Sequence, residues 1–182
     1  MFDPGIERAI RTATVAHGGQ TRKGSDLPYI THPAHVALIL VRAGASSATV
    51  QAGILHDVVE DCDDWTLERL ESEFGEEVSA IVAELTEDKS KTWEERKLAA
   101  VEKATTMSAE GALVKAADQL HNLKALEESL GRAADPDEIW ARFNGGRDAT
   151  IEMAMRLLEA LTGRVDPKIT EASRQALAAI RG

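Results

Sequence analysis

Ile54-Leu55-His56-Asp57-Val58-Val59-Glu60-Asp61 is an octet of four apolar and four ionisable residues. If the octet is one continuous helix, with about 100° per residue, its apolar side chains share one face and its ionisable side chains share the other. No lysine or arginine lies within one turn on either side, so three carboxylates crowd beside one imidazole without a local cation to neutralise them. Two interpretations remain at this point: a bound metal ion, or the solvated acidic face that charge runs more often form.

The composition restricts the classes of protein to which the chain can belong. With 182 residues, of which 43% are hydrophobic and 29% charged, we expect one globular domain spanning residues 1–182. The net charge of −10 argues against a nucleic-acid-binding protein, which would present a basic face. No apolar run approaches the ~20 residues of a membrane span, and the N-terminus has no secretory pattern. The single cysteine, Cys62, fits a reducing compartment, so the cytoplasm is the expected location.

Helix signals are frequent along the chain, and strand signals are weak. Aromatic residues are only 4% of the sequence, and no segment shows a sustained alternation of β-branched and polar residues. Three Asp-Pro pairs place an N-cap acceptor before a proline, and Thr92 with Glu95 can form a capping box. The predicted fold class is therefore all-α, a compact multi-helix bundle. Helices are expected near residues 3–17, 32–44, 46–61, 66–74, 78–85, 92 onward, 108–130, 135–162 with a break at 144–146, and 167–181.

Two further segments carry residues that could join the octet in a metal site. His32 stands at the junction between an irregular basic loop, residues 18–31, and the next expected helix. Asp118 and Asn122 are four residues apart, so both project from one face of a helix with apolar neighbours. A carboxylate in apolar surroundings is unfavourable unless it is paired or bound to a metal. Two imidazoles and two carboxylates suit Mn²⁺, Fe²⁺ or Zn²⁺ better than Ca²⁺.

Four motifs follow one another in the chain. They are Arg22-Lys23-Gly24 with Pro28-Tyr29-Ile30-Thr31-His32-Pro33, then His56-Asp57-Val58-Val59-Glu60-Asp61, then Glu95-Arg96-Lys97, and finally Lys115-Ala116-Ala117-Asp118-Gln119-Leu120-His121-Asn122. In this order they resemble the HD-domain metal-dependent phosphohydrolases. The likeness is closer to one branch of that family, the hydrolase domain of RelA/SpoT-type proteins and the single-domain small alarmone hydrolases. It covers about residues 8–160, and leaves residues 167–181 as an amphipathic C-terminal helix outside it.

The resemblance implies a role for each matching residue, and implies the compact bundle of the HD-domain type. One Mn²⁺ per chain would be bound by four residues, His32, His56, Asp57 and Asp118. The attacking water would be positioned or deprotonated by two, Glu60 and Asp61. The nucleotide would be contacted by six, namely Arg22 and Lys23 at the base or its flanking groups, Lys115 and Asn122 near the phosphates, and Arg96 and Lys97 at the distal phosphate.

The implied reaction removes the 3′-diphosphate of ppGpp or pppGpp, giving GDP or GTP and pyrophosphate. The only partner expected is this small nucleotide, with neither a nucleic acid nor a membrane. An alternative is an HD phosphatase acting on NADPH or another nucleotide, because Gln119 and Ala125 stand where family members often have a basic residue and a hydroxyl. A nucleotide-sensing module with little turnover is a third interpretation, which the presence of both Glu60 and Asp61 disfavours.

Overall fold

The computed structural model describes residues 2–182, and within that range every regular element is an α-helix. In chain order the helices are α1 (Pro4–Ala16), α2 (Thr31–Arg42), α3 (Ser47–Leu55), α4 (Val58–Asp61), α5 (Leu67–Phe74), α6 (Glu76–Leu85), α7 (Trp93–Ala104), α8 (Ala109–Arg132), α9 (Pro136–Trp140), α10 (Gly146–Leu161) and α11 (Pro167–Arg181). An isolated β-bridge between Thr21 and Pro28 pinches the loop that joins α1 to α2. The predicted all-α bundle is confirmed. No helix within residues 2–182 is both long and apolar enough to cross a membrane.

The helices begin where short polar side chains can cap them. Asp3, Ser46 and Ser108 each accept a hydrogen bond from a backbone N–H in the first turn of the helix that follows. At α7 the predicted capping box is present, because Thr92 Oγ1 accepts from the Glu95 N–H and the Glu95 carboxylate accepts from the Thr92 N–H. Such caps satisfy N–H groups that have no partner inside the helix, so local sequence fixes these helix starts.

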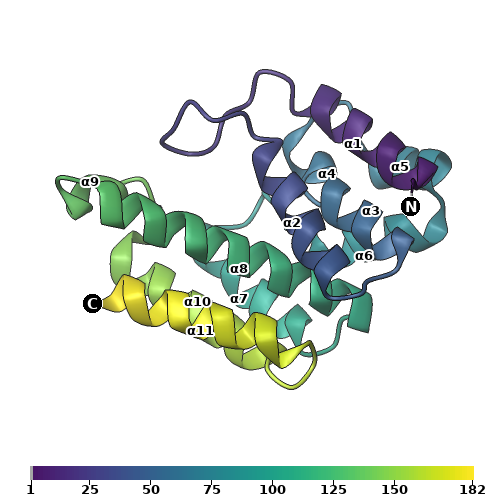
Figure 1. Ribbon diagram of the computed structural model, residues 1–182. Helices are drawn as coiled ribbons and strands as arrows, with labels where there is room; N and C mark the ends of the chain where they lie inside the picture. Colours follow the sequence, from purple (N-terminus) through teal and green to yellow (C-terminus); the bar gives the residue numbers. More distant parts are fainter. Residues whose placement is uncertain (1) are drawn as a thin grey trace.

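Helix α8 lies in the middle of the molecule, between two groups of helices (Figure 1). On one side it packs against α2, α3 and α6, around a core that includes the fully buried Val36, Leu40 and Val114. On the other side it packs against α10 and α11, where Leu126 and Leu177 contribute to a second core cluster. Because α8 borders both clusters, a side chain on its α2-facing surface has a position fixed by packing on two sides.

The octet is not one continuous helix, so that prediction was wrong. Helix α3 ends at Leu55 and α4 begins at Val58, with His56 and Asp57 in the turn between them. The Nδ1 atom of His56 lies 2.9 Å from the Gly53 carbonyl oxygen, the acceptor that an uninterrupted helix would offer to the Asp57 N–H. A side chain has therefore replaced a backbone donor at this step. The apolar residues of the octet still face the core, and His56 and Asp57 form the turn between the two helices.

The second break is also longer than predicted. Within residues 135–162 the sequence indicated an interruption at 144–146. In the structure α9 ends at Trp140 and α10 begins only at Gly146, so residues 141–145 are not part of a helix. Gly145 packs directly on the ring of Trp93, where a Cβ atom would overlap the indole. This close approach joins the break to the start of α7.

Candidate metal centre

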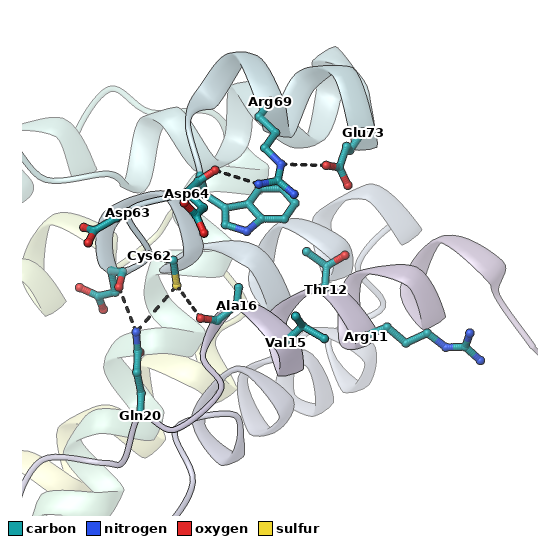
Figure 2. Close-up of a pocket in the computed structure, with 12 residues that line it drawn as sticks. Arg11, Thr12, Val15, Ala16, Gln20, Cys62, Asp63, Asp64, Arg69 and Glu73 are labelled. Atoms are coloured by element: carbon teal, nitrogen blue, oxygen red, sulfur yellow. Dashed lines mark hydrogen bonds and ion pairs between the residues drawn. The ribbon is translucent and has the colours of Figure 1, made fainter.

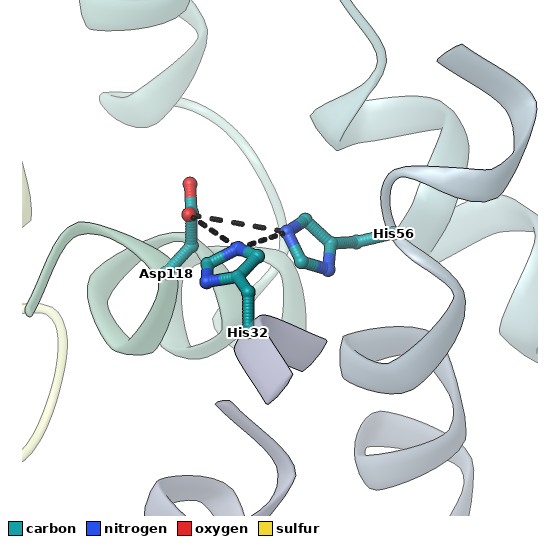
Figure 3. A group of neighbouring side chains, drawn as sticks. All are labelled: His32, His56 and Asp118. Atoms are coloured by element: carbon teal, nitrogen blue, oxygen red, sulfur yellow. Dashed lines mark hydrogen bonds and ion pairs between the residues drawn. The ribbon is translucent and has the colours of Figure 1, made fainter. Parts of the chain in front are cut away.

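Three side chains from distant parts of the sequence place ligand atoms within 4.8 Å of one another: His32 on α2, His56 between α3 and α4, and Asp118 on α8 (Figure 3). His32 Nε2 lies 3.3 Å from His56 Nε2 and 3.4 Å from Asp118 Oδ1. His56 Nε2 lies 3.9 Å from the same carboxylate oxygen. Both imidazoles are buried, so the group lies where α2, α3 and α8 pack against one another.

Asp57 adds a fourth candidate ligand to this group. Its Oδ2 atom lies 3.1 Å from His56 Nε2 and 3.6 Å from His32 Nε2. The Tyr29 hydroxyl donates a hydrogen bond of 2.5 Å to this same oxygen. Burial, followed by the neighbouring negative charge of Asp57, raises the pKa of Tyr29, so the phenol stays protonated and remains a donor. The structure thus brings together all four residues that the sequence suggested as ligands.

Both histidines are oriented by hydrogen bonds on the side away from the carboxylates. His56 Nδ1 faces the Gly53 carbonyl, which can only accept, so this nitrogen carries the proton and Nε2 keeps a free lone pair. His32 Nδ1 lies 2.8 Å from His121 Nδ1. Burial lowers the pKa of His121 to about 4, so His121 is neutral at pH 7 and can accept this bond. The two Nε2 atoms are then free to bind a cation.

The charge of Asp118 is stabilised from several directions. Burial would raise the pKa of this carboxyl, but the neighbouring Lys115 ammonium outweighs burial and holds the pKa well below its usual range. Lys115 Nζ lies 3.3 Å from Asp118 Oδ2, and Asn122 Nδ2 donates to Asp118 Oδ1 over 2.5 Å. Asn122 in turn accepts a hydrogen bond of 2.8 Å from Arg22 Nη2. Three residues expected to bind the nucleotide are therefore linked to the candidate ligand Asp118: Lys115 and Asn122 contact it directly, and Arg22 contacts it through Asn122.

The chemistry of this donor set fits a divalent cation. Two carboxylates and two imidazole lone pairs point at one small volume, and His32 Nε2 has three other ligand atoms within 3.6 Å. Mutual repulsion among these groups is relieved when a cation binds between them. The mixture of imidazole nitrogen and carboxylate oxygen matches the preference of Mn²⁺, Fe²⁺ or Zn²⁺.

Glu60 and Asp61, the residues expected to handle water, lie on α4 and make different contacts. Glu60 Oε2 accepts a hydrogen bond of 3.2 Å from the Glu87 N–H, and burial raises the pKa of the Glu60 carboxyl. Asp61 Oδ1 forms an ion pair of 2.6 Å with Lys89 Nζ. The sequence showed no cation within a helical turn of the octet. The cation comes instead from the loop between α6 and α7, which only the fold brings close.

The remaining expected substrate contacts are divided between two places. Arg96 and Lys97, at the start of α7, both form ion pairs with Glu87. Lys23 is exposed, with its ammonium 5.3 Å from the centre of the Phe143 ring, so it stands beside the segment that joins α9 to α10. The structure thus places Arg22 and Lys23 at one edge of the site, and Arg96 and Lys97 on the side of α4.

A cavity of about 600 Å³ lies beside the site rather than at the candidate ligands (Figure 2). It opens between α1 and the segment from α4 to α5, where Gln20 reaches the Asp61 carbonyl and approaches the sulfur of Cys62. None of the four candidate ligands lines it, and Asp61 is its only member among the expected site residues. The converging ligand atoms, rather than this cavity, therefore mark the candidate metal centre.

Three residues outside the expected site set contact it in the structure, namely Tyr29, Glu87 and Lys89. Tyr29 was visible inside the second half of the first motif, but no spacing rule links its hydroxyl to Asp57. Glu87 and Lys89 lie in a polar loop, for which the sequence permitted either a plain loop or one that closes over the site. Their contacts with Glu60 and Asp61 cross nearly 30 positions of sequence. His121, which belongs to the fourth motif, contacts the far side of the His32 ring through its Nδ1 atom.

Comparison with known proteins places the chain in a family. The sequence model of the HD domain matches residues 9–151. The guanosine-3′,5′-bis(diphosphate) 3′-pyrophosphohydrolase MESH1 of Xenopus tropicalis is 42% identical over 125 residues, which are 67% of this chain and 69% of that protein. The human MESH1 is 46% identical over 113 residues, 60% of this chain and 63% of that protein. A GTP pyrophosphokinase of Streptomyces coelicolor is 39% identical over 145 residues, 75% of this chain, but the chain spans only 17% of its length.

A solved structure has the same architecture. It is that of a metazoan ortholog of SpoT, described as hydrolysing ppGpp, and it superposes with a TM-score of 0.82 at 29% sequence identity. The superposition covers 98% of this chain and 96% of the other. The fold is therefore the all-α bundle of the HD-domain type, as the sequence predicted. Since the HD-domain model covers well over half of the residues, the chain belongs to the HD-domain family.

Proposed function

We propose that this protein is a Mn²⁺-dependent hydrolase that removes the 3′-diphosphate from ppGpp or pppGpp, giving GDP or GTP and pyrophosphate. The observation that carries the proposal is the convergence of His32, His56, Asp57 and Asp118 beside a set of basic residues. The names of the MESH1 relatives and of the SpoT ortholog support the choice of substrate. In this proposal the four residues hold one Mn²⁺ per chain.

The surrounding residues have roles that follow from their positions. A divalent cation held by these ligands lowers the pKa of water and polarises a phosphate group. Glu60 is the proposed general base, because its Oε2 is engaged by the Glu87 N–H while its other oxygen can accept a proton. The pKa of Glu60 is raised toward neutral pH, and a general base acts more effectively when its pKa is close to the pH of the reaction. Asp61 is proposed to orient the water.

The basic residues are proposed to bind the nucleotide itself. Lys115, Arg96 and Lys97 would neutralise the negative charge that builds up on the phosphates during the reaction. Arg22, Lys23 and Asn122 would contact the nucleoside and its nearby groups. Because the chain as a whole carries a net charge of −10, binding of a polyphosphate depends on this local group of cations.

The proposal is tested with a nucleotide panel. With added Mn²⁺, the purified protein is expected to release pyrophosphate and GDP from ppGpp in equal amounts, and the Asp57→Ala variant is expected to release neither. Release of inorganic phosphate from NADPH, without pyrophosphate from ppGpp, would replace the substrate assignment with the alternative one. Tight binding of ppGpp that is not hydrolysed, with no bound metal by elemental analysis, would instead indicate a sensing module.

One of the two grounds for the NADPH alternative is weakened by the structure. Gln119 was noted because family members often carry a basic residue at that position. Its side chain is buried and donates a hydrogen bond of 2.7 Å to the Ala154 carbonyl on α10. A residue that joins α8 to α10 in this way bears on packing rather than on the choice of nucleotide.

Tyr29→Phe is expected to weaken Mn²⁺ binding by about tenfold without unfolding the protein. The substitution removes only the hydroxyl that fixes Asp57 Oδ2, and the ring contact with His17, with centroids 4.6 Å apart, is kept. Groups that orient a metal ligand typically contribute about 10–100-fold to affinity. Isothermal titration with Mn²⁺ measures the change, and an unaltered affinity with an intact circular dichroism spectrum would show that Asp57 needs no such support.

A further inference from the structure

The loop that joins α6 to α7, residues 86–92, lies directly against the proposed catalytic carboxylates. The Glu87 backbone N–H donates to Glu60 Oε2 over 3.2 Å, and Lys89 Nζ lies 2.6 Å from Asp61 Oδ1. Both catalytic carboxylates are therefore held by the same short loop. Any group that fixes this loop also fixes the position of the proposed base.

The Glu87 side chain makes a second set of contacts, with the cations expected to bind phosphate. The side chain is 9% exposed, and its carboxylate lies 2.7 Å from Lys97 Nζ and 3.3 Å from Arg96 Nη1. Arg96 Nε is buried and has no hydrogen-bond partner among the described residues. The Arg96 guanidinium thus makes a single long contact with Glu87, although its geometry would allow two parallel hydrogen bonds to an oxyanion. Glu87 is a poorer partner for Arg96 than a phosphate group would be.

We infer that Glu87 is a positioning residue that acts as an internal anion: its carboxylate holds Arg96 and Lys97 and competes with the substrate's phosphate for them, while its backbone N–H holds Glu60. This inference rests on the proposed function and adds a role that the family motifs do not contain. Both functions reside in one residue, because the backbone of Glu87 faces α4 and its side chain faces α7. The arrangement links occupation of the phosphate site to the placement of the base.

The loop has other anchors, so removing the charge of Glu87 need not unfold it. Lys103 Nζ donates to the Thr86 carbonyl over 3.2 Å, and the capping box of Thr92 and Glu95 fixes the opposite end. Glu87→Gln keeps the size of the side chain and one acceptor oxygen, and it removes the negative charge. The inference is therefore testable with a folded variant.

The first arm of the test measures binding of pyrophosphate to the Mn²⁺-loaded protein by isothermal titration. Glu87→Gln is expected to lower the Kd for pyrophosphate by about fivefold or more, the lower end of ordinary coupling between two ligands of one site. The matched control is Asp88→Asn. Asp88 is the next acidic residue, and its hydrogen bonds go to Ser90 within the loop, so its substitution should leave the Kd unchanged. An unchanged or weaker affinity in Glu87→Gln overturns the inference.

The second arm uses kinetics on ppGpp. In Glu87→Gln both kcat and KM are expected to fall, kcat by about tenfold, a part of the ~10²–10⁴-fold that a positioned base supplies. A role in folding alone would lower the melting temperature and the active fraction while KM stayed constant, and that result also overturns the inference. If the wild-type protein hydrolyses no nucleotide, the proposed function fails, but the pyrophosphate titration still decides whether Glu87 competes for Arg96 and Lys97.

Discussion

Asp118→Asn is expected to weaken Mn²⁺ binding by at least about 100-fold and to abolish measurable release of pyrophosphate from ppGpp. Asparagine has nearly the same shape, so the change removes the negative charge with little loss of packing. The charge matters because Asp118 Oδ1 lies within 4 Å of both candidate histidine ligands. An amide at this position would also leave the largely buried Lys115 without its carboxylate partner.

The measurement combines metal titration with steady-state kinetics, and the control lies on the same helix. Glu128→Gln also removes one carboxylate from α8, but Glu128 is exposed and pairs only with Arg132, one turn further along. We expect Glu128→Gln to keep wild-type affinity and turnover, because exposed ion pairs of this kind contribute little. If Asp118→Asn binds Mn²⁺ within a factor of two of the wild type while remaining folded, Asp118 is not a ligand.

The features of the fold that could be predicted from sequence are those that local chemistry determines. Asp3, Ser46 and Thr92 cap helices through bonds to residues two or three positions away, so a short window of sequence contains all the participants. The candidate ligands could also be found, because an acidic residue on an apolar helix face is unfavourable without a partner, wherever that partner lies. Asp118 was identified in this way, and the structure places its carboxylate beside Lys115, His32 and His56.

The features that could not be predicted depend on contacts between distant segments. The break after Leu55 follows from a hydrogen bond between His56 and Gly53, which a helical wheel cannot represent because it assumes that the backbone continues. The pairing of Asp61 with Lys89 and the contact of Glu60 with Glu87 require α4 and the α6–α7 loop to meet. A search for neutralising cations within one helical turn therefore missed the cation that is present.

Gly53→Ala is expected to lower the free energy of unfolding by about 1–3 kcal/mol and to weaken Mn²⁺ binding. A Cβ atom at this position would overlap Cδ1 of Leu40 and lie 3.4 Å from Val36 Cγ1. Both of these α2 residues are fully buried, so neither can move aside freely. The Gly53 carbonyl also receives His56 Nδ1, so a displacement of α3 would move the His56 ring away from the other ligands. Urea unfolding and Mn²⁺ titration measure the two effects separately.

The control is a glycine in a helix that has space around it. Gly131 lies near the end of α8, and an added Cβ there would meet nothing within 4 Å. Gly131→Ala should therefore stabilise the protein by up to about 1 kcal/mol through helix propensity, with no change in Mn²⁺ affinity. The opposite signs expected for the two substitutions separate close packing from helix propensity. A stabilised Gly53→Ala variant would show that α2 and α3 can separate without strain.

A double substitution tests whether contact with Leu40 is the cause. Leu40→Ala alone is expected to destabilise by about 2–5 kcal/mol, because it leaves a cavity in the core. In the combined Gly53→Ala and Leu40→Ala variant the new methyl group enters that cavity, so the total loss should be smaller than the sum of the two single losses. The Mn²⁺ affinity should recover as well, because the close approach of α2 and α3 sets the 3.3 Å distance between His32 and His56. Strictly additive losses would mean that Gly53 acts on the metal centre by another route.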